Sequence, residues 1–329
     1  EVQRRVHKAE WRSAASLLQS RGVAPPTAAT RAALERKLVG GPSDLLPPRV
    51  RPGSPGRGVS RDALYKALSS APSSSAPGPS GLRFSHLQAF KAHPRALAWL
   101  GGLCDRIADG DVPEAAVGLL ALTKLTPLLK DGGGIRPVAG GECLRKLAAR
   151  ALVREHRDTL LEAVGPAQYG AGRPGGAETL VHAVQVVSEA RPDLAWVQLD
   201  VANAFPSVSR RAVLEAVAEH APALLPLAET FLRRASSFVF QGSGGRGVVL
   251  RATLGVEQGD VLGANTRGIV GLLERSLLSF LGWCKESTPP AIVGQPDASD
   301  DAIDVVPVGP SVFEALEGHE SCPFGGNEP

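Results

Sequence analysis

The sequence contains no methionine, only four cysteines, and few aromatic residues, which make up 5% of the chain. The cysteines lie far apart without a Cys-x-x-Cys pair, so we expect neither a disulfide framework nor a zinc site, and a reducing compartment fits better. No apolar run reaches the roughly 18 residues that span a bilayer, and no secretory leader is recognisable, so we expect no membrane contact. A translation product begins with Met, whereas this chain begins Glu1-Val2-Gln3; we therefore expect a fragment or a processed piece.

Charge is distributed unevenly along the 329 residues, although the net charge is only +3. Residues 1–199 carry 27 Lys+Arg against 17 Asp+Glu, a balance of +10, and residues 200–329 carry 9 against 16, a balance of −7. A basic part joined to an acidic part suits an enzyme of nucleic acids, because cations follow the phosphates and carboxylates hold metal ions. Solvent-exposed faces that differ by chance would give the same pattern, so both interpretations stay open.

Hydrophobic spacing and turn residues predict helices interleaved with antiparallel hairpins. Helices are expected near residues 1–20, 27–38, 60–68 with Ser60 as the cap, 83–122 with breaks at Pro94 and Pro113, 144–160 as one long helix, 178–190, 210–234 as two helices, and 262–281. Strands are expected at residues 123–129 and 135–138, at 194–199, and at 238–240 and 248–250. Residues 40–58 are rich in Pro, Gly and Arg and are expected to form a linker. This interleaved order predicts an α+β fold.

A carboxylate follows the apolar run 194–199 directly, at Asp200. A strand fixes such a side chain rigidly, so Asp200 is a candidate ligand of a divalent cation, and the carbonyl of Val201 could join it. A bulky Phe205 follows five residues later. The alternative is that Asp200 only caps the strand or forms a turn.

A second polar segment, Gly255-Val-Glu-Gln-Gly-Asp-Val-Leu-Gly263, lies between the second hairpin and an expected helix. Gln258 supplies both a hydrogen-bond donor and an acceptor, and Gly259 allows a ligand to approach the backbone closely. Taken alone, the segment is also typical of a turn that enters a helix.

Five segments, in their order along the chain, resemble motifs of reverse transcriptases, especially those of non-LTR (LINE-like) retrotransposons. Leu199-Asp-Val-Ala-Asn-Ala-Phe205 resembles the first aspartate motif of that family, and Gly255-x-x-Gln-Gly-Asp260 resembles its Gln-Gly-Asp turn. The three upstream segments are Pro77-Gly-Pro-Ser-Gly-Leu82, which resembles "GPDG", Lys130-Asp-Gly-Gly-Gly-Ile-Arg-Pro-Val138, which resembles the "K-D-G-x-x-R-P-I" fingers hairpin, and Tyr169–Thr179, which resembles "FGFRPGRST". The resemblance covers about residues 71–263.

The resemblance implies an RNA-directed DNA polymerase that uses two Mg²⁺ ions, with Mn²⁺ as an alternative. Asp200 and the carbonyl of Val201 would ligate the ions, which sit about 3.5–4 Å apart in two-metal catalysis. Phe205 falls at the steric gate of the family, where a ring excludes ribonucleotides.

Four further residues match positions that contact nucleotides in the family. Lys130 and Arg136 match fingers residues that hold the incoming triphosphate, and an arginine can do so through a bidentate fork. Gln258 and Gly259 would line the nascent base pair and the template.

The second acidic motif of the family, an aromatic-x-Asp-Asp hairpin, has only Asp300 and Asp301 as candidates, so these two carboxylates are expected to complete the metal site. Ala298 stands in place of the aromatic residue, and the preceding Gly294-Gln-Pro-Asp297 makes a poor central strand. The segment after Gly263 also departs from the family pattern, which suggests a shifted reading frame or decay of that element. The alternative for Asp300 and Asp301 is an acidic surface loop.

The implied architecture is a right-hand polymerase with fingers and palm, an antiparallel palm sheet flanked by helices, and no thumb. Its expected parts are a helical segment and linker (1–58), a fingers-like region (59–193), a palm-like region (194–308) and a tail (309–329). Implied partners are an RNA template, a DNA primer and deoxynucleoside triphosphates, in the nucleus or the cytoplasm. A catalytically dead remnant that only binds nucleic acid is the alternative.

Two further groups of residues carry expectations. The cations Arg145, Lys146, Arg150, Arg154 and Arg157 fall along the expected helix 144–160, where they either follow template phosphates or face solvent. Trp99, Trp196 and Trp283 lie in apolar runs and are expected in the core.

Overall fold

A computed structural model of the chain describes residues 2–7, 11, 15, 18–39, 45–47, 58–73, 75–131, 133–164, 169, 174–192, 204–242 and 247–257. The contacts between residues divide the chain into two units: Glu1–Pro166 with Asn203–Ile269, and Ala167–Ala202 with Val270–Pro329. The expected strand at 194–199 and the expected helix at 262–281 lie outside the described residues.

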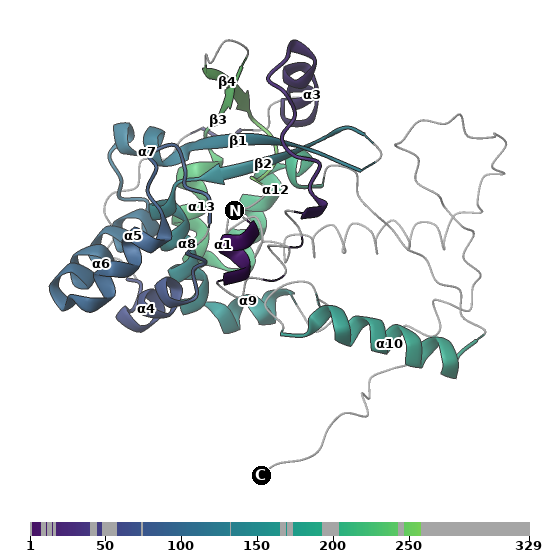
Figure 1. The fold of residues 1–329 in the computed structure, drawn as a ribbon. Helices are drawn as coiled ribbons and strands as arrows, with labels where there is room; N and C mark the ends of the chain where they lie inside the picture. The colour runs from purple at the N-terminus through teal and green to yellow at the C-terminus, as the bar shows by residue number, and fades with distance from the viewer. Residues whose placement is uncertain are drawn as a thin grey trace. The chain divides into compact units, whose positions relative to one another are not determined.

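The first unit is built around a four-stranded sheet in the order β2-β1-β3-β4 (Figure 1). Its strands are β1 (Leu122–Leu129), β2 (Ile135–Gly141), β3 (Ser236–Gln241) and β4 (Gly247–Ala252). Both predicted hairpins are confirmed, because β1–β2 and β3–β4 pair antiparallel.

The two hairpins meet in a parallel pairing of β1 with β3, so the described sheet is mixed and the expectation of an antiparallel sheet is only partly met. Parallel neighbours need a long crossover, and the helical chain between β2 and β3 supplies it.

The N-terminal segment of the first unit lies along the end of β1. Val23 forms an isolated bridge with Leu128, and the amide of Ala24 donates to the carbonyl of Pro127 at 2.8 Å. The predicted helix follows as α3 (Ala28–Leu38), is capped by the hydroxyl of Thr27, and packs against β2 and β4. Together these elements bury one apolar cluster: Ala24, Leu34, Leu38, Leu125, Ile135, Ala139, Phe238, Phe240, Leu250 and Ala252.

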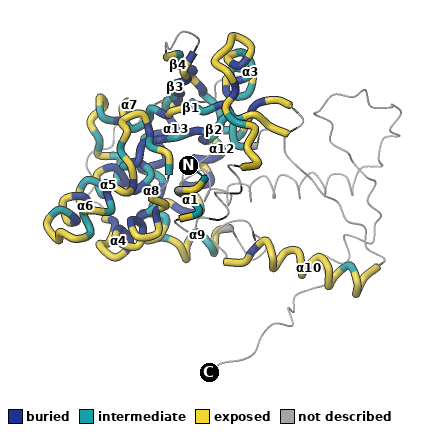
Figure 2. Tube along the Cα trace, in the orientation of Figure 1, coloured by how far each residue is buried: buried dark blue, intermediate teal, exposed yellow. Residues whose placement is uncertain are grey.

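The helices that come before and after the first hairpin in the sequence form a helical layer. It contains α4 (Arg61–Ser69), α5 (Phe84–Gln88), η1 (Ala89–Ala92), α6 (Pro94–Ala108), α7 (Glu114–Ala121) and α8 (Cys143–Glu155). The Ser60 cap and the breaks at Pro94 and Pro113 are confirmed. Helices α4 and α6 pack against α8, and Figure 2 shows the buried side of this layer.

The long helix expected at 144–160 is interrupted. Helix α8 ends at Glu155, His156 adopts φ −106° and ψ 26°, and α9 (Arg157–Val164) begins after it. Further elements of the first unit are α1 (Val2–His7), α11 (Ala204–Ser207), α12 (Arg210–His220), η2 (Pro222–Leu224) and α13 (Leu225–Leu232). The prediction of two helices within 210–234 is thus confirmed, and a short 3₁₀ turn joins them.

The second unit contributes α10 (Gly176–Ala190) to the described residues, close to the expected 178–190. Gly175 precedes it in the left-handed region at φ 64°. A Cβ at Gly176 would collide with the carbonyl of Tyr169, so the start of the Tyr169–Thr179 segment lies against the start of α10.

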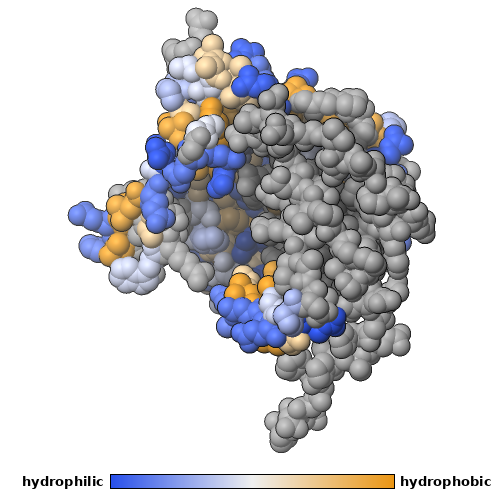
Figure 3. Space-filling view, turned by 90° about the vertical axis from the view of Figure 1, so that its right-hand side faces the viewer, coloured by the Kyte–Doolittle hydropathy of each residue, from blue (hydrophilic) through white to orange (hydrophobic). Residues whose placement is uncertain are grey.

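The described helices and sheet confirm a mixed α and β architecture. None of the described helices is long and apolar enough to cross a membrane. On the side drawn in Figure 3, the described residues expose hydrophilic side chains interspersed with small hydrophobic patches.

Candidate functional site

The β1–β2 hairpin brings two of the predicted site residues to one end of the sheet. Lys130 directly follows β1, and Arg136 lies in β2 opposite Leu128; both are exposed. The turn is closed by a hydrogen bond from the amide of Lys130 to the carbonyl of Gly134, 3.2 Å. Asp131 in this turn pairs with Arg21 at 2.8 Å, so the carboxylate of the turn is already engaged by a cation from outside the hairpin.

The Pro77–Leu82 loop is bound to the start of α8 through Glu142. The carboxylate of Glu142 accepts hydrogen bonds from the amide of Ser80 at 2.7 Å and from its hydroxyl at 2.5 Å. A Cβ on Gly78 would lie 2.9 Å from the Cα of Glu142, so the close approach of the two backbones requires glycine there. Burial raises the pKa of the neighbouring Cys143 thiol, and Glu142 adds to this, while Lys146 partly opposes it.

Helix α8 is in turn bound to the Gly255–Gly263 segment through a buried ion pair. Arg145 donates to one carboxylate oxygen of Glu257 at 3.2 Å, and the two side chains are only 5% and 6% exposed. The hydroxyl of Thr123, at the start of β1, donates to the other oxygen at 2.9 Å. The guanidinium also lies over the ring of Phe231, 4.3 Å from its centroid. Glu257 therefore joins α8, the sheet and the residues immediately before Gln258.

The same segment contacts the residues that follow the first aspartate motif. The amide of Val256 donates to the carbonyl of Phe205 at 2.8 Å, and the amide of Gly255 donates to the carbonyl of Val208 at 2.9 Å. Gly255 has φ 72°, and a Cβ there would collide with the carbonyl of Pro206. The 204–208 segment and the 254–257 segment are thus paired backbone to backbone.

The buried Arg210 holds this pairing from the side of α12. Its guanidinium donates to the carbonyl of Gly255 at 2.8 Å, to that of Leu254 at 3.2 Å and to the hydroxyl of Ser236 at 2.8 Å. Arg210 is 1% exposed. One cation therefore ties the start of β3 to the loop that leads to Gln258.

Several predicted site residues lie outside the described residues: Asp200, Val201, Gln258, Gly259, Asp300 and Asp301. Among the residues that the structure describes, no group of three or more His, Cys, Asp or Glu side chains is arranged to hold a metal ion. Of the remaining candidates, Phe205 is half-buried beside Val256, and Lys130 and Arg136 share the hairpin end.

The row of cations expected along 144–160 separates into different environments. Arg145 is buried in its ion pair, so the expectation that it follows phosphates or faces solvent is wrong. Arg150 and Arg154 instead converge on Ser70 at the end of α4. Trp99 is 64% exposed, so its expected place in the core is also wrong.

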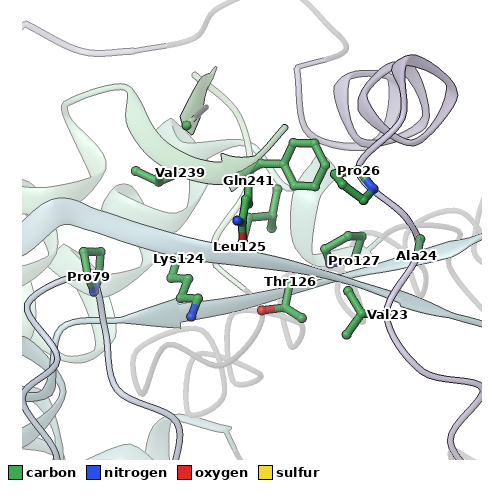
Figure 4. A pocket seen from close by; sticks show the side chains of 12 residues that line it. Val23, Ala24, Pro26, Pro79, Lys124, Leu125, Thr126, Pro127, Val239 and Gln241 are labelled. Carbon is green, nitrogen blue, oxygen red and sulfur yellow. The ribbon is translucent and has the colours of Figure 1, made fainter. Parts of the chain in front are cut away.

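A cavity of about 600 Å³ lies between the N-terminal segment and the inner strands. In Figure 4, Lys124 and Thr126 point to the same side of β1, while Pro127 and Val23 border the opposite end. The cavity is lined mostly by apolar and proline side chains, with Lys124 as its cation, and it contains neither Lys130 nor Arg136. Among the described candidates, Lys130 and Arg136 are therefore separate from this cavity.

Sequence reasoning missed three residues that hold these segments together: Glu142, Arg210 and Glu257. The position of Glu257 inside a recognised motif was the available signal, because a carboxylate between Val256 and Gln258 has to be either solvated or paired. Neither Glu142 nor Arg210 carries a comparable signal, since the role of each follows from which segments meet in space.

Comparisons with known proteins relate the chain to mobile elements. It is 28% identical over 195 residues to the "Retrotransposable element SLACS 132 kDa protein" of Trypanosoma brucei gambiense. The aligned part is 57% of this chain but only 16% of that relative, so the chain spans a small fraction of the length of the protein it matches. No family model matches. The chain is thus related to a retrotransposon protein.

Proposed function

We propose that this chain is part of a retrotransposon RNA-directed DNA polymerase, comprising fingers and palm, which copies RNA into DNA. The observation that carries the proposal is the backbone pairing of residues 204–208 with residues 254–257. These segments contain the end of the first aspartate motif, at Phe205, and the start of the Gln-Gly-Asp motif, at Gly255, and a polymerase of this kind needs the two motifs close together. The similarity to a retrotransposon protein supports the same conclusion.

Further support comes from the way the described motif segments are connected. The Pro77–Leu82 loop contacts α8 through Glu142, α8 contacts Glu257, and Glu257 contacts β1 of the hairpin. A set of unrelated surface segments would have no reason to be linked by buried, charge-assisted contacts. Such a connected series of contacts is what a shared substrate site requires.

In the proposed reaction the 3′-oxygen of the primer attacks the incoming deoxynucleoside triphosphate, a bond to the α-phosphorus forms, and pyrophosphate leaves. Lys130 and Arg136 would bind and orient the triphosphate through charge-assisted hydrogen bonds. Phe205 would crowd the sugar 2′ position and favour deoxyribonucleotides. Bound Mg²⁺, held by Asp200, the carbonyl of Val201 and the pair Asp300 and Asp301, would neutralise the charge that develops on the phosphates. All of these ligands lie outside the described residues, so the metal site is part of the proposal.

A primer-extension assay tests the proposal. The full chain with oligo(dT)-primed poly(A), dTTP and Mg²⁺ should extend the primer, and Asp200→Ala should abolish extension. The matched control is Asp62→Ala, which removes a carboxylate that pairs with Lys66 on the exposed face of α4; it should extend normally. If the intact chain leaves the primer unextended under all metal conditions, the polymerase proposal fails.

Two finer variants examine the assigned roles. Arg136→Gln should raise the KM for dTTP far more than it lowers kcat, because a ground-state contact to the triphosphate is removed. Phe205→Ala should increase incorporation of UTP relative to dTTP. Equal effects of Phe205→Ala on both nucleotides would contradict the gate.

The second candidate function is a remnant that binds nucleic acid without copying it. Two observations favour it: the balance of +10 in residues 1–199 and the absence of the aromatic residue before Asp300. Filter binding should then fall steeply with salt, with a slope set by the number of phosphates contacted. Salt-dependent binding without extension would select this candidate, and the reading frames downstream of codon 263 would show whether an aromatic-x-Asp-Asp hairpin has been lost to a frame error.

A further inference from the structure

An exposed strip of aromatic and basic side chains runs across the helical layer of the first unit. We call it the α4–α8 strip; it consists of Tyr65, Ser69, Ser70, Phe90, Lys91, Trp99, Arg150 and Arg154. The ammonium of Lys91 lies 5.4 Å from the centroid of Tyr65 and donates to the hydroxyl of Ser69 at 3.2 Å. The ring of Phe90, the residue before Lys91, stacks with Trp99 at 6.4 Å. Contacts thus connect the strip from α6 to α4.

At its other end the strip holds two arginines around one hydroxyl. Arg154 donates to the hydroxyl of Ser70 at 2.6 Å, and Arg150 donates to the same oxygen at 3.2 Å and to the carbonyl of Ser70 at 3.3 Å. Within the described part of the chain, neither guanidinium has a carboxylate within ion-pair distance.

Among the described residues this pair of like charges therefore has no compensating carboxylate, and the guanidinium of Arg150 lies over the ring of Phe84, 6.0 Å from its centroid. Burial lowers the pKa of Arg150, and the charge of Arg154 lowers it further. The Nε of Arg150 is buried and has no hydrogen-bond partner among the described residues. Two neighbouring cations that lack an acid are stabilised by an external anion, and a phosphate accepts from two arginines at once.

The rest of the strip presents rings rather than acids. Trp99 is 64% exposed and Tyr65 46% exposed, so both rings are accessible to a ligand. Rings beside cations are the combination that binds single-stranded nucleic acid, because bases stack on the rings while the cations contact the backbone. An apolar protein partner would instead leave the arginine pair without an anion.

We propose that the α4–α8 strip binds a single strand of nucleic acid, with a backbone phosphate at Arg150 and Arg154 and a base stacked on Trp99. The choice of partner rests on the proposed function, whereas the site does not: none of its residues belongs to the β1–β2 hairpin or to the 204–208 and 254–257 segments. The strip is thus a second strand-binding surface, which would hold template or product outside the site of nucleotide addition.

Fluorescence anisotropy with the full chain and a labelled oligouridine of about 20 nucleotides, longer than a typical single-strand site, tests the charges. The experiment is done in EDTA, so that binding does not depend on metal. The double variant Arg150→Gln/Arg154→Gln should bind on the order of tenfold more weakly, and the slope of log K against log salt should decrease by about 0.7, because one phosphate would no longer be neutralised. The matched control Arg31→Gln/Arg106→Gln removes two cations that already have surface carboxylate partners; it should bind within about twofold of the parent chain.

Trp99→Ala tests the ring, with Trp11→Ala as the control, because both indoles are 64% exposed. Trp99→Ala should weaken oligouridine binding on the order of tenfold, as loss of one stacked base does, and should leave binding of inorganic polyphosphate unchanged. Ultraviolet crosslinking should attach oligouridine to a peptide that contains Tyr65 or Trp99. Circular dichroism confirms that each variant is folded.

Three results would overturn the proposal. The first is that the double arginine variant binds oligouridine as tightly as its control variant, and the second is that Trp11→Ala and Trp99→Ala weaken binding equally. The third is that polyglutamate competes as effectively as unlabelled oligouridine, which would indicate an acidic peptide as the partner. Oligo(dT) in parallel shows whether the strand is RNA or DNA. The Asp200→Ala variant should still bind oligouridine through the α4–α8 strip. If the parent chain binds oligouridine but does not extend a primer, the polymerase proposal is refuted and the proposal for the strip still holds.

Discussion

Replacing Glu257 by Gln should destabilise the first unit strongly, because it breaks the buried ion pair while leaving Arg145 charged. The two side chains are 5% and 6% exposed, and the carboxylate accepts from both the guanidinium and the hydroxyl of Thr123. Breaking a buried pair on one side typically costs about 3–5 kcal/mol, since an uncompensated charge stays buried. The amide of Gln still accepts one hydrogen bond, so we expect a loss of about 3 kcal/mol in the free energy of unfolding.

Urea denaturation followed by circular dichroism measures this loss as a lower midpoint at constant slope. Glu35→Gln is the matched control, because Glu35 pairs with Arg31 on the exposed face of α3 and should cost less than about 1 kcal/mol. The double variant Arg145→Met/Glu257→Gln should recover much of the stability, since it removes the buried guanidinium together with the carboxylate.

Equal midpoints for Glu257→Gln and Glu35→Gln would refute the reasoning, because the ion pair would then be solvated. The result matters for function as well. The Glu257 variant should lose primer extension together with stability, since the same carboxylate holds the residues that precede Gln258 against α8 and β1.

Three more predictions concern single residues. Gly78→Ala should lower the free energy of unfolding by about 1–3 kcal/mol, because its Cβ would meet the Glu142 backbone at 2.9 Å. In the same urea experiment Gly102→Ala should raise the free energy of unfolding by up to about 1 kcal/mol, because Gly102 lies on an open surface of α6. Burial raises the pKa of Cys104 to about 12, so iodoacetamide at pH 8 should leave this thiol unalkylated in the folded chain and alkylate it after denaturation. Peptide mass mapping that finds Cys104 alkylated under native conditions would contradict the prediction. Arg210→Met should lower the free energy of unfolding by at least about 3 kcal/mol, because the carbonyls of Leu254 and Gly255 would lose their hydrogen-bond donor. Limited proteolysis should then cut near residue 255. A variant that is uncut and equally stable would show that water replaces the guanidinium.

Local signals in the sequence predicted most element boundaries well. Ser60 caps α4, and Pro94 and Pro113 begin new helices, because a capping hydroxyl and proline act within a few residues. The glycine-rich turn between Lys130 and Ile135 likewise predicted a hairpin. Such features need no information about distant parts of the chain.

Other features escaped sequence reasoning for identifiable reasons. The break at His156 leaves the helical spacing of apolar residues on both sides unchanged, so periodicity cannot detect it. The parallel pairing of β1 with β3 depends on which strand edges meet after collapse. Trp99 lies in an apolar run yet is exposed, because it stands outside the face of α6 that buries Leu97, Leu100 and Cys104.

The arginines of α8 show most clearly which features follow from the sequence and which depend on the tertiary structure. Arg145, Arg150 and Arg154 have the same side chain and lie on the same helix, but one is buried against Glu257 and two converge on Ser70. Their spacing along α8 follows from the sequence, whereas the partner that each one meets depends on other helices and loops.

The sequence by itself determined the order of the motifs, the helix caps, the two hairpins and the resemblance to polymerases of mobile elements, because each depends on residues close together in the chain or on a recognisable pattern. Only the tertiary structure decided that residues 204–208 pair with residues 254–257, that Glu257 is neutralised by Arg145, and that Arg150 and Arg154 converge on Ser70. These outcomes depend on burial and on which distant groups come within a few ångströms, and charge and hydrogen-bond energies change steeply over such distances.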